Sequence, residues 1–380
     1  MTSNTGLEGV VAARTRLSHV DGERGELIIA GYPLAEIAPN ATFEEVAWLL
    51  WHGRRPSLAE LADFRRELAA RRPLSRATLA LIRECAAARI DSMDALRIAA
   101  GSISLASDDA TTILAQLPSI VAAYWRCTND EGPIAPRPDL AHAANYLYML
   151  TGEEPDAERS RALETYLITV IDHGLNASTF TCRVICSTGS DLVSAIVGAI
   201  GALKGPLHGG APGPALETVF EIGAAKRAET ILRRKIEAGE RLMGFGHRVY
   251  KVRDPRADVL GAAAERLFNR GGDMSLYRLA REVEATALRL LEEYKPGRRL
   301  QTNVEFYTAL LLHGLGLDVP LFTPTFAIGR AAGWIGHAFE QRAANRLIRP
   351  ASEYVGPTDL RWAPAPSPSS AAPRTAAAGA

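Results

Sequence analysis

Two patterns of apolar and polar positions divide the chain and predict different secondary structures. Residues 6–34 alternate between polar and apolar positions and are interrupted by Asp21-Gly22 and by Gly31. This pattern is typical of short strands joined by tight turns. From Thr42 onward the apolar residues recur three and four positions apart, which is the spacing of one face of a helix. We therefore expect an all-α fold with a small β element of short strands at the N-terminus.

The same spacing locates several individual helices. Thr42 is followed by Phe-Glu-Glu, so it is expected to cap a helix whose first turn is acidic. Regular strand patterns are nearly absent after residue 40. Further helices are predicted at residues 141–150, 158–171, 191–203 and 278–293.

Two clusters of glycine and proline, at residues 205–214 and 314–324, mark breaks between helices. Such a cluster can act as a shaped loop or as a hinge. We expect a smaller domain inserted into a larger one, followed by a tail dominated by Ala, Pro, Ser, Thr and Gly. The predicted parts are a large helical domain of residues 1–212 and 313–362, a small lid domain of residues 213–312, and a disordered tail of residues 363–380.

The charge balance and the cysteines restrict the class of protein. The 380 residues include 43 Lys and Arg and 43 Asp and Glu, so the net charge creates no field that attracts nucleic acid or an anionic membrane. The apolar stretches are shorter than the ~18–20 residues that span a bilayer, and no signal-peptide pattern is present. Four cysteines without a CxxC pair fit a reducing compartment. We expect a cytoplasmic protein with neither nucleic acid nor a membrane as a partner.

No short motif points to a metal ion or a nucleotide cofactor. The closest two of the eight histidines, His313 and His337, are 24 positions apart, so no local zinc site is predicted. The sequence contains neither GxSxG nor GxxxxGK(S/T). We therefore predict that the protein uses no metal and no cofactor.

Polar residues in or near the glycine-rich breaks are the remaining candidates for chemistry. His208 is followed by two glycines, and His247 follows Gly-Phe-Gly, so both histidines can approach a ligand closely. Arg330 and Arg349 stand among apolar neighbours, where an unpaired charge is costly and an anionic partner is needed. Taken alone, each residue also fits an ordinary loop histidine or a structural ion pair.

Taken together and in this order, the motifs closely resemble the bacterial and archaeal citrate synthase family. The resemblance runs from about residue 6 to residue 357, and residues 53–140 match only loosely. The matching segments are Gly6-Leu-Glu-Gly-Val-Val, Asp21-Gly-Glu, Asp172-His-Gly-Leu-Asn-Ala-Ser-Thr-Phe, His208-Gly-Gly, Gly244-Phe-Gly-His-Arg-Val-Tyr-Lys, Asp254-Pro-Arg-Ala, Asn303-Val-Glu-Phe, Phe322-Thr-Pro, Arg330-Ala-Ala-Gly-Trp, and Arg349-Pro with Tyr354-Val-Gly-Pro.

The resemblance implies a citrate synthase-like fold, a reaction and three catalytic residues. The enzyme would condense acetyl-CoA with oxaloacetate and water to give citrate and CoA, converting the acyl group to an alkyl group on transfer. His208 would hydrogen-bond the thioester carbonyl and stabilise the enol. His247 would polarise or protonate the ketone of oxaloacetate, and Glu305 would remove the α-proton of the acyl-CoA.

The resemblance also implies which residues hold the substrates. Arg349 would reach into the site of the second subunit of a homodimer, so that the active sites are shared. The residues assigned to oxaloacetate are His173, Arg256, Arg330 and Arg349, with Asn176 and Ser178 as supports and with Lys251 and Arg253 as candidate CoA ligands.

Elementary chemistry agrees with this set of residues. A thioester α-proton is a very weak acid, so a carboxylate base needs a donor that neutralises the enolate as it forms. One such donor is worth roughly 10²–10³ in rate, and general acid–base catalysis contributes ~10²–10⁴. Oxaloacetate has two carboxylates, which several inward arginines can bind in pairs of hydrogen bonds. The reaction needs no metal and no redox cofactor.

Two positions depart from the family pattern. The base of the family is usually aspartate, whereas Glu305 stands here, and its extra methylene moves the carboxylate by about 1 Å, a shift that can cost ~10²-fold. Residues 211–213, Ala-Pro-Gly, replace the usual Ala-Asn-Glu. The second departure puts the adenine contacts of CoA in question.

Several alternatives stay open from the sequence. A 2-methylcitrate synthase would use propionyl-CoA with the same residues, and one methylene in an apolar pocket discriminates by only ~1–3 kcal/mol. A lyase that cleaves citryl-CoA and a non-catalytic member that binds CoA are further possibilities. A helical scaffold without a ligand would require all the arginines to be structural.

Overall fold

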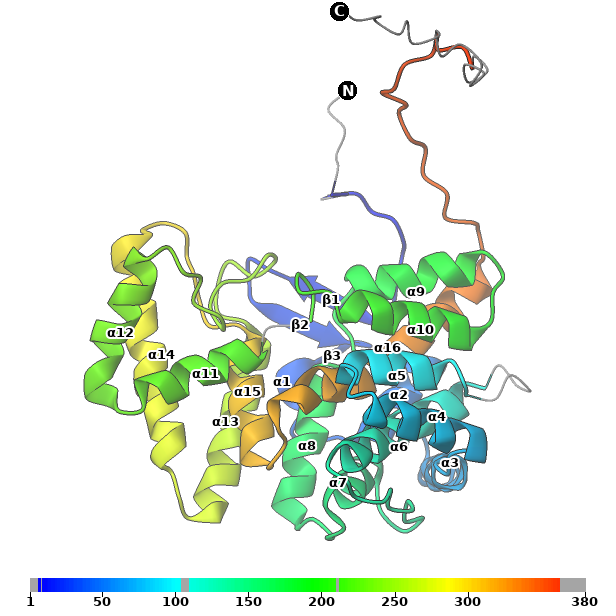
Figure 1. Ribbon diagram of the computed structural model, residues 1–380, viewed down its shortest axis with the longest axis horizontal. Coiled ribbons are helices and arrows are strands. Elements are labelled where there is room, and N and C mark those ends of the chain that lie inside the picture. The colour runs from blue at the N-terminus through cyan, green and yellow to red at the C-terminus, as the bar shows by residue number, and fades with distance from the viewer. Residues whose placement is uncertain (1–5, 8, 104–108, 210–211, 363–380) are drawn as a thin grey trace, which may run out of the picture. The chain divides into compact units, whose positions relative to one another are not determined.

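The computed structural model describes residues 6–7, 9–103, 109–209 and 212–362. These residues form sixteen α-helices, three short strands and one 3-10 helix (Figure 1). The predicted all-α fold with a small β element at the N-terminus is therefore confirmed. The predicted disordered tail, residues 363–380, lies outside the described residues.

The β element is an antiparallel sheet of three strands in chain order. Ser18 pairs with Ile29, and Asp21 pairs with Glu26 across the first turn. Leu27 and Ile29 are buried, so the alternation of the second strand directs one face of the sheet into the core. The strands are β1 (Ser18–Asp21), β2 (Glu26–Ile29) and β3 (Tyr32–Pro33).

Among the first ten helices, α2 begins at the cap that the sequence predicts at Thr42. The Thr42 hydroxyl accepts the Glu45 N–H at 3.3 Å, and the Glu45 carboxylate accepts the Thr42 N–H at 2.7 Å, which is the predicted cap in its reciprocal form. Three predicted helices correspond to α7, α8 and α10. The bounds are α1 (Leu34–Ile37), α2 (Phe43–His52), α3 (Leu58–Arg71), α4 (Arg76–Ala87), α5 (Ser92–Ala100), α6 (Ala110–Thr128), α7 (His142–Thr151), α8 (Ala157–Thr169), α9 (Ala177–Ser187) and α10 (Leu192–Leu203).

The following five helices lie together on one side of the ribbon (Figure 1). Helix α12 packs against α14, α13 packs against α15, and α13 also packs against α8. The helix predicted at residues 278–293 is part of α14. The division of the chain into a large domain and a lid stays a prediction. The bounds are α11 (Pro212–Ile222), α12 (Ala225–Glu237), α13 (Pro255–Gly271), α14 (Ser275–Tyr294), α15 (Val304–Gly314), the 3-10 helix η1 (Val319–Leu321) and α16 (Phe322–Ala343).

Helix α16 is the central element of the core. It packs against α2, α6, α8, α9 and α10, and its Trp334 is fully buried. A Cβ at Gly333 would lie 2.1 Å from the carbonyl oxygen of Ile171. The backbone of α16 therefore approaches the segment before His173 at a distance that only glycine permits, and this contact fixes the segment that carries His173.

The chain separates into two units, Met1–Leu347 and Ile348–Ala380. The described part of the second unit, residues 348–362, contains no helix or strand. Within it the Tyr354 hydroxyl donates to the carbonyl oxygen of Pro357 at 2.9 Å. Arg349 belongs to this second unit and is exposed.

No single helix among the described residues has both the length and the apolar character needed to cross a membrane. One pair, Val304–Gly314 with Val319–Ala343, meets the criterion jointly by length and composition, and it is bent by 119°.

Candidate active site

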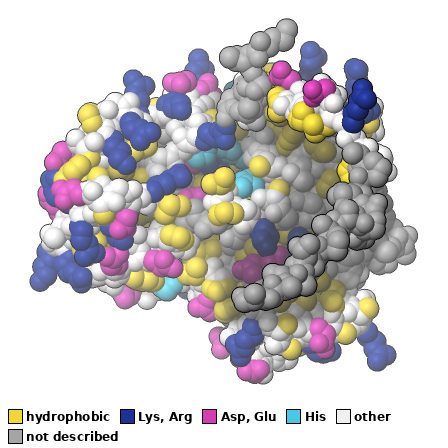
Figure 2. Space-filling model, turned by 45° about the horizontal axis from the view of Figure 1, so that its top comes forward, with side chains coloured by type: hydrophobic (Ala, Val, Ile, Leu, Met, Phe, Trp, Pro, Cys, Tyr) yellow, Lys and Arg dark blue, Asp and Glu magenta, His cyan; other side chains and the backbone are white. Residues whose placement is uncertain are grey.

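Four segments that are distant in the sequence meet around three histidines. The ring centroids of His173 and His247 are 5.7 Å apart, and the Arg256 guanidinium lies 3.3 Å from His247 Nε2. Figure 2 shows histidine side chains recessed near the middle of the face that it presents, with Lys and Arg side chains nearby. The structure thus brings together His173, Arg256 and Arg330, which the sequence assigns to oxaloacetate.

His208 is held as a neutral ring by the start of α9. Its Nε2 accepts the backbone N–H of Ser178 at 3.2 Å and lies 2.9 Å from the Ser178 hydroxyl. A backbone N–H can only donate, so the neutral ring carries its proton on Nδ1. Burial, together with the charge of Arg330, lowers the pKa of His208 to about 4. His208 is therefore a neutral ring that carries its proton on Nδ1.

Ser178 is itself fixed by two neighbours. Its hydroxyl lies 2.8 Å from Asn176 Oδ1 and accepts the indole N–H of Trp334 at 3.1 Å. Asn176 also caps α9 by accepting the Thr179 N–H. Hydrogen bonds therefore lead from Asn176 through Ser178 to His208, and the supporting roles of Asn176 and Ser178 stay a prediction.

His247 is oriented by its own loop. Its Nδ1 accepts the backbone N–H groups of Val249 and Tyr250, each at 3.1 Å, so the neutral ring carries its proton on Nε2. Burial and the neighbouring Arg256 lower the pKa of His247 to about 4. The Nε2–H and the Arg256 guanidinium are then two donors that converge, and a ligand oxygen can accept from both.

Tyr250 joins His173 to His247, and it is not among the residues that the sequence assigns to the site. Its hydroxyl lies 3.1 Å from His173 Nε2, and its ring centroid lies 4.9 Å from that of His247. Burial is the main cause that lowers the pKa of His173 well below its ordinary value. The only sequence signal for Tyr250 is its place in the motif that contains His247.

Arg256 is buried and anchored by Asp254. Two nitrogens of its guanidinium bind the Asp254 carboxylate at 3.0 and 2.7 Å. The same carboxylate accepts the backbone N–H of Val304 at 3.2 Å. Asp254 therefore joins the start of α13 to the start of α15 and fixes Arg256 relative to Glu305.

Arg330 differs from Arg256 because it lacks such an anchor. Its side chain is 1% exposed, and its Nε donates to the carbonyl oxygen of Val170. Within the described part of the chain, no carboxylate forms a salt bridge with it. Burial lowers the pKa of Arg330 to about 10. A buried guanidinium in this state is costly unless an anion binds it.

Glu305 lies in the first turn of α15 with its carboxylate available. Its backbone N–H is capped by Asn303 Oδ1 at 3.0 Å, and Asn303 Nδ2 also donates to the carbonyl oxygen of Gly246 at 2.8 Å. Burial raises the pKa of Glu305, and Arg256 acts in the opposite direction. The Glu305 carboxylate accepts no hydrogen bond from any residue that the structure describes, which suits a proton acceptor.

The two candidate CoA ligands differ in their surroundings. The Arg253 guanidinium binds Asp258 at 2.5 Å and Glu284 at 2.7 Å. Lys251 is exposed, and its ammonium group donates to the carbonyl oxygen of Arg248 at 3.4 Å. Arg253 would have to share its guanidinium with two carboxylates in order to bind CoA, whereas Lys251 can turn toward a ligand.

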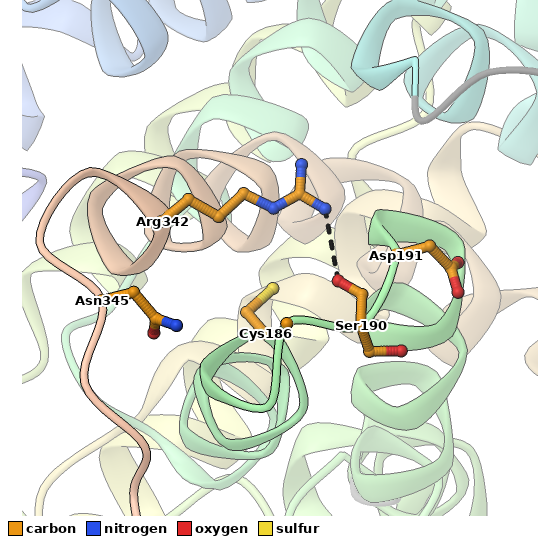
Figure 3. Close-up of a pocket in the computed structure, with 6 residues that line it drawn as sticks. Cys186, Ser190, Asp191, Arg342 and Asn345 are labelled. Carbon is orange, nitrogen blue, oxygen red and sulfur yellow. Dashed lines mark hydrogen bonds between the residues drawn. The ribbon is translucent and has the colours of Figure 1, made fainter.

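A separate cavity lies near the ends of α9 and α16 (Figure 3). Its volume is about 430 Å³, and Arg342 donates to the Ser190 carbonyl oxygen at 3.4 Å beside it. None of the predicted site residues lines this cavity. The lining residues are Cys186, Gly189, Ser190, Asp191, Arg342 and Asn345.

The described residues contain no group of three or more His, Cys, Asp or Glu side chains that could hold a metal ion.

The turn between β1 and β2 lies directly on the loop that carries His247. The Gly22 carbonyl oxygen accepts the Lys251 N–H at 2.8 Å. A Cβ at Gly22 would lie 2.2 Å from the carbonyl oxygen of Val249. The φ of Gly22 is outside the left-handed region, so the close approach of Val249, and not the turn itself, requires glycine here.

Comparison with known proteins places this geometry in a family. A family model described as "Citrate synthase, C-terminal domain" matches residues 6–351. The citrate synthase of Haloferax volcanii is 40% identical over 375 residues, covering 94% of this chain and 97% of that protein. The 2-methylcitrate synthase of Shewanella oneidensis is 38% identical over 364 residues, covering 93% and 95%.

Solved structures are similar over nearly the whole chain. The citrate synthase of Pyrobaculum aerophilum has a TM-score of 0.88 and 37% identity, covering 95% of this chain and 94% of that chain. The citrate synthase of Thermoplasma acidophilum was solved as a ternary complex with carboxymethyl coenzyme A and oxaloacetate. It has a TM-score of 0.85 and 29% identity, covering 95% and 98%.

Substitution of Gly22 by alanine is expected to loosen the loop of residues 247–253. The added methyl group would overlap the Val249 carbonyl oxygen, so the backbone has to shift. Overpacking of this kind typically lowers the stability of the folded state by about 1–3 kcal/mol. Hydrogen–deuterium exchange of the loop amides should become faster. Gly132→Ala is the matched control, because no atom lies within 4 Å of the added Cβ. A folded Gly22→Ala protein with unchanged exchange in this loop would contradict the prediction.

Proposed function

Because this chain belongs to the citrate synthase family, we propose that the recess around His173 and His247 condenses acetyl-CoA with oxaloacetate and water to give citrate and CoA. The protein is a citrate synthase-type acyltransferase. The observation that carries the assignment of the site is the buried guanidinium of Arg330, which forms no salt bridge with a carboxylate among the described residues. A dianionic 2-oxo acid supplies the missing negative charge.

Arg330 and Arg256 bind the two carboxylates of oxaloacetate in this proposal. Arg256 is oriented by Asp254, and Arg330 by the Val170 carbonyl oxygen, so each guanidinium keeps nitrogens free to donate. Charge-assisted pairs of this kind are shorter and stronger than neutral hydrogen bonds. Their fixed positions hold the ketone carbon in place for attack.

His247 activates the ketone. Its Nε2–H and the Arg256 guanidinium converge, so both donate to the ketone oxygen and stabilise the alkoxide that forms there. The lowered pKa of His247 favours the neutral ring. A neutral donor withdraws less charge than an imidazolium, but it can transfer its proton to a strongly basic alkoxide.

Glu305 and His208 act together on the acyl-CoA. Glu305 removes the α-proton, and its raised pKa makes the carboxylate a stronger base than an exposed glutamate. The Nδ1–H of His208 donates to the thioester oxygen as the enolate forms. The enolate carbon then attacks the ketone carbon, and water hydrolyses the citryl thioester to release CoA.

Water must be kept away until the carbon–carbon bond has formed. The lid domain of residues 213–312 carries His247, Arg256 and Glu305, whereas His173 and Arg330 lie outside it. Oxaloacetate bound between these two sets draws the lid closed, which excludes water from the thioester. No step of this sequence requires a metal ion or a redox cofactor.

A homodimer with shared active sites completes the proposal. Helices α9 and α10 keep apolar side chains partly exposed, including Phe180, Val184 and Val197, and a second copy would cover them. Arg349 is exposed and belongs to the second unit of the chain, which suits a contact with the partner subunit. No disulfide bond joins the four cysteines, all of which lie in the described part of the chain, and this supports a cytoplasmic location.

A second candidate function is 2-methylcitrate synthesis from propionyl-CoA. A relative named 2-methylcitrate synthase is 38% identical to this chain, close to the 40% of the citrate synthase of Haloferax volcanii. The two substrates differ by one methylene, which an apolar pocket discriminates by only about 1–3 kcal/mol. Both reactions use the same residues, so the acyl chain has to be identified by assay.

The first prediction of the proposed function is that CoA release from acetyl-CoA requires oxaloacetate. Thiol release should be measured with acetyl-CoA and with propionyl-CoA, each with and without oxaloacetate. Arg330→Gln should raise KM for oxaloacetate at least about 10²-fold, because several kcal/mol of ion pairing is lost. Absence of oxaloacetate-dependent release with either acyl-CoA would favour a non-catalytic CoA-binding protein.

The second prediction concerns Glu305. Glu305→Gln should bind oxaloacetate nearly as well as wild type and turn over at least ~10² more slowly, since a general base is lost. Glu305→Asp should also be slower, because its carboxylate retreats by about 1 Å. Calorimetric binding of oxaloacetate separates the two effects. Unchanged turnover of Glu305→Gln would show that another group removes the proton.

The pH profile gives an independent test of the same residue. The pKa of Glu305 is raised above 4.5, so the base is protonated as the pH falls through that raised value. The acid limb of kcat/KM should therefore have an apparent pKa above that of an ordinary glutamate, and this limb should disappear in Glu305→Gln.

The third prediction concerns assembly. Arg349→Ala and His208→Ala proteins, each inactive alone, should regain activity when they are mixed, unfolded and refolded together. Random pairing makes half of the dimers mixed, and each mixed dimer has one intact site, so about a quarter of wild-type activity should return. If light scattering shows the wild-type protein to be a monomer and this monomer is fully active, the prediction of shared active sites is refuted.

A further inference from the structure

A row of buried polar side chains follows one face of α16. Arg330, Trp334, His337 and Gln341 are spaced by four, three and four residues, so they share a face of the helix. All four are 7% exposed or less. Arg330 and Trp334 already belong to the site described above. His337 lies between them and Gln341, and the reaction as proposed does not use it.

The hydrogen bonds of His337 fix its tautomer. The Arg183 guanidinium lies 2.9 Å from His337 Nδ1, and a guanidinium can only donate. The neutral ring therefore carries its proton on Nε2, which donates to Asp172 Oδ1 at 3.1 Å. His337 and Asp172 are both fully buried, so this bond is shielded from water and from salt.

Arg183 is held in turn by the end of α16. Its Nη1 binds the Glu340 carboxylate at 3.0 Å, and its Nε donates to Gln341 Oε1 at 3.2 Å. The guanidinium therefore has little freedom to turn away from His337. Hydrogen bonds therefore connect the partly exposed Glu340 to the buried Asp172 through Arg183 and His337, and each donor faces an acceptor.

Asp172 receives a second hydrogen bond on its other oxygen. The Ser18 hydroxyl donates to Asp172 Oδ2, and the same hydroxyl accepts the Gly174 N–H at 2.7 Å. Asp172 and Gly174 are the two chain neighbours of His173. Both chain neighbours of His173 are thus held by hydrogen bonds. Asp172 binds His337 and Ser18, and Gly174 binds Ser18.

Asp172 also influences the charge at the substrate site. Burial acts to raise its pKa, but His337, Arg330 and the Ser18 hydroxyl all act in the opposite direction, and the pKa of Asp172 is lowered. The ionised carboxylate favours the charged form of Arg330. It is near enough to act on Arg330 through space, yet it forms no salt bridge with that guanidinium among the described residues.

We propose that His337 and Ser18 are positioning residues for oxaloacetate recognition, because they hold the Asp172 carboxylate from two sides and so fix His173 and the charge environment of Arg330. Asp172 partly balances the Arg330 charge without occupying its donors, which stay available to the substrate. The role rests on the proposed function, since oxaloacetate is the ligand that His173 and Arg330 recognise. It predicts a selective effect on oxaloacetate and not on the acyl-CoA.

The test uses two substitutions that differ by one methylene. In His337→Asn the amide oxygen can still accept from Arg183, but the side chain is too short to reach Asp172. In His337→Gln the amide nitrogen reaches further and can restore the donor. At metal sites, which offer a comparison, loss of a hydrogen bond to a ligating side chain lowers metal affinity or activity about 10- to 100-fold. We expect KM for oxaloacetate to rise about tenfold in His337→Asn and to be mostly recovered in His337→Gln.

KM for acetyl-CoA should stay within about twofold of wild type in both variants, because His208 binds Ser178 and not His337 or Asp172, and the Glu305 backbone is held by Asn303. His142→Asn is the matched control. His142 is another buried histidine, 1% exposed, and it lies beside Glu44 at the start of α7. The control should lose thermal stability without changing KM for oxaloacetate, which separates a positioning role from general loss of packing.

Ser18→Ala provides a second route to the same conclusion if His337→Asn does not fold. It removes the bond to Asp172 Oδ2 from a partly buried position, and it should also raise KM for oxaloacetate selectively. A folded His337→Asn or Ser18→Ala protein with reduced stability and unchanged KM for oxaloacetate overturns the proposal. Failure of the proposed function itself would be seen differently, as absence of oxaloacetate-dependent CoA release in the wild-type protein.

Discussion

The arrangement of the site depends on a positive charge buried in the core. Arg330 stands on a central helix whose neighbouring turns carry Gly333 and Trp334, and it is 1% exposed. Desolvation of such a charge costs several kcal/mol unless it is compensated. The fold offers the Val170 carbonyl oxygen and, through space, the Asp172 carboxylate. These two groups leave Arg330 with uncompensated positive charge, which a ligand with negative charge can balance.

Burial and the neighbouring positive charges together determine the charge state of the histidines. Arg330 and Arg256, together with burial, keep His208 and His247 neutral near pH 7. Each ring then has one proton, and the backbone decides where it resides by donating to the other nitrogen. The two rings are thereby prepared as donors before any substrate arrives. Preorganised donors of this kind need no rearrangement as charge develops.

Much of the fold and part of the site could be predicted from the sequence. Helical spacing and the cap at Thr42 depend on neighbours within one or two turns, so both were visible and are confirmed. The motifs also predicted that His173, His247 and Arg256 belong to one site, and the structure places these three together. The environment of Arg253 and the partners of His337 could not be predicted, because they depend on contacts between distant segments. The position of Gly22 against Val249 is of the same kind, and the role of Arg349 stays a prediction.

The bonds that hold Asp172 have a consequence for how the protein folds. Ser18 and Asp172 are 154 positions apart, and Asp172 and His337 are 165 positions apart. The chain between each pair of residues must close into a loop, which costs conformational entropy, before the hydrogen bond can form and offset that cost. The segment around His173 therefore reaches its final form only after the ribosome has released α16. A nascent chain that ends before α16 would contain His173, His208, His247 and Glu305 in sequence, yet it would lack the support that gives them a common geometry.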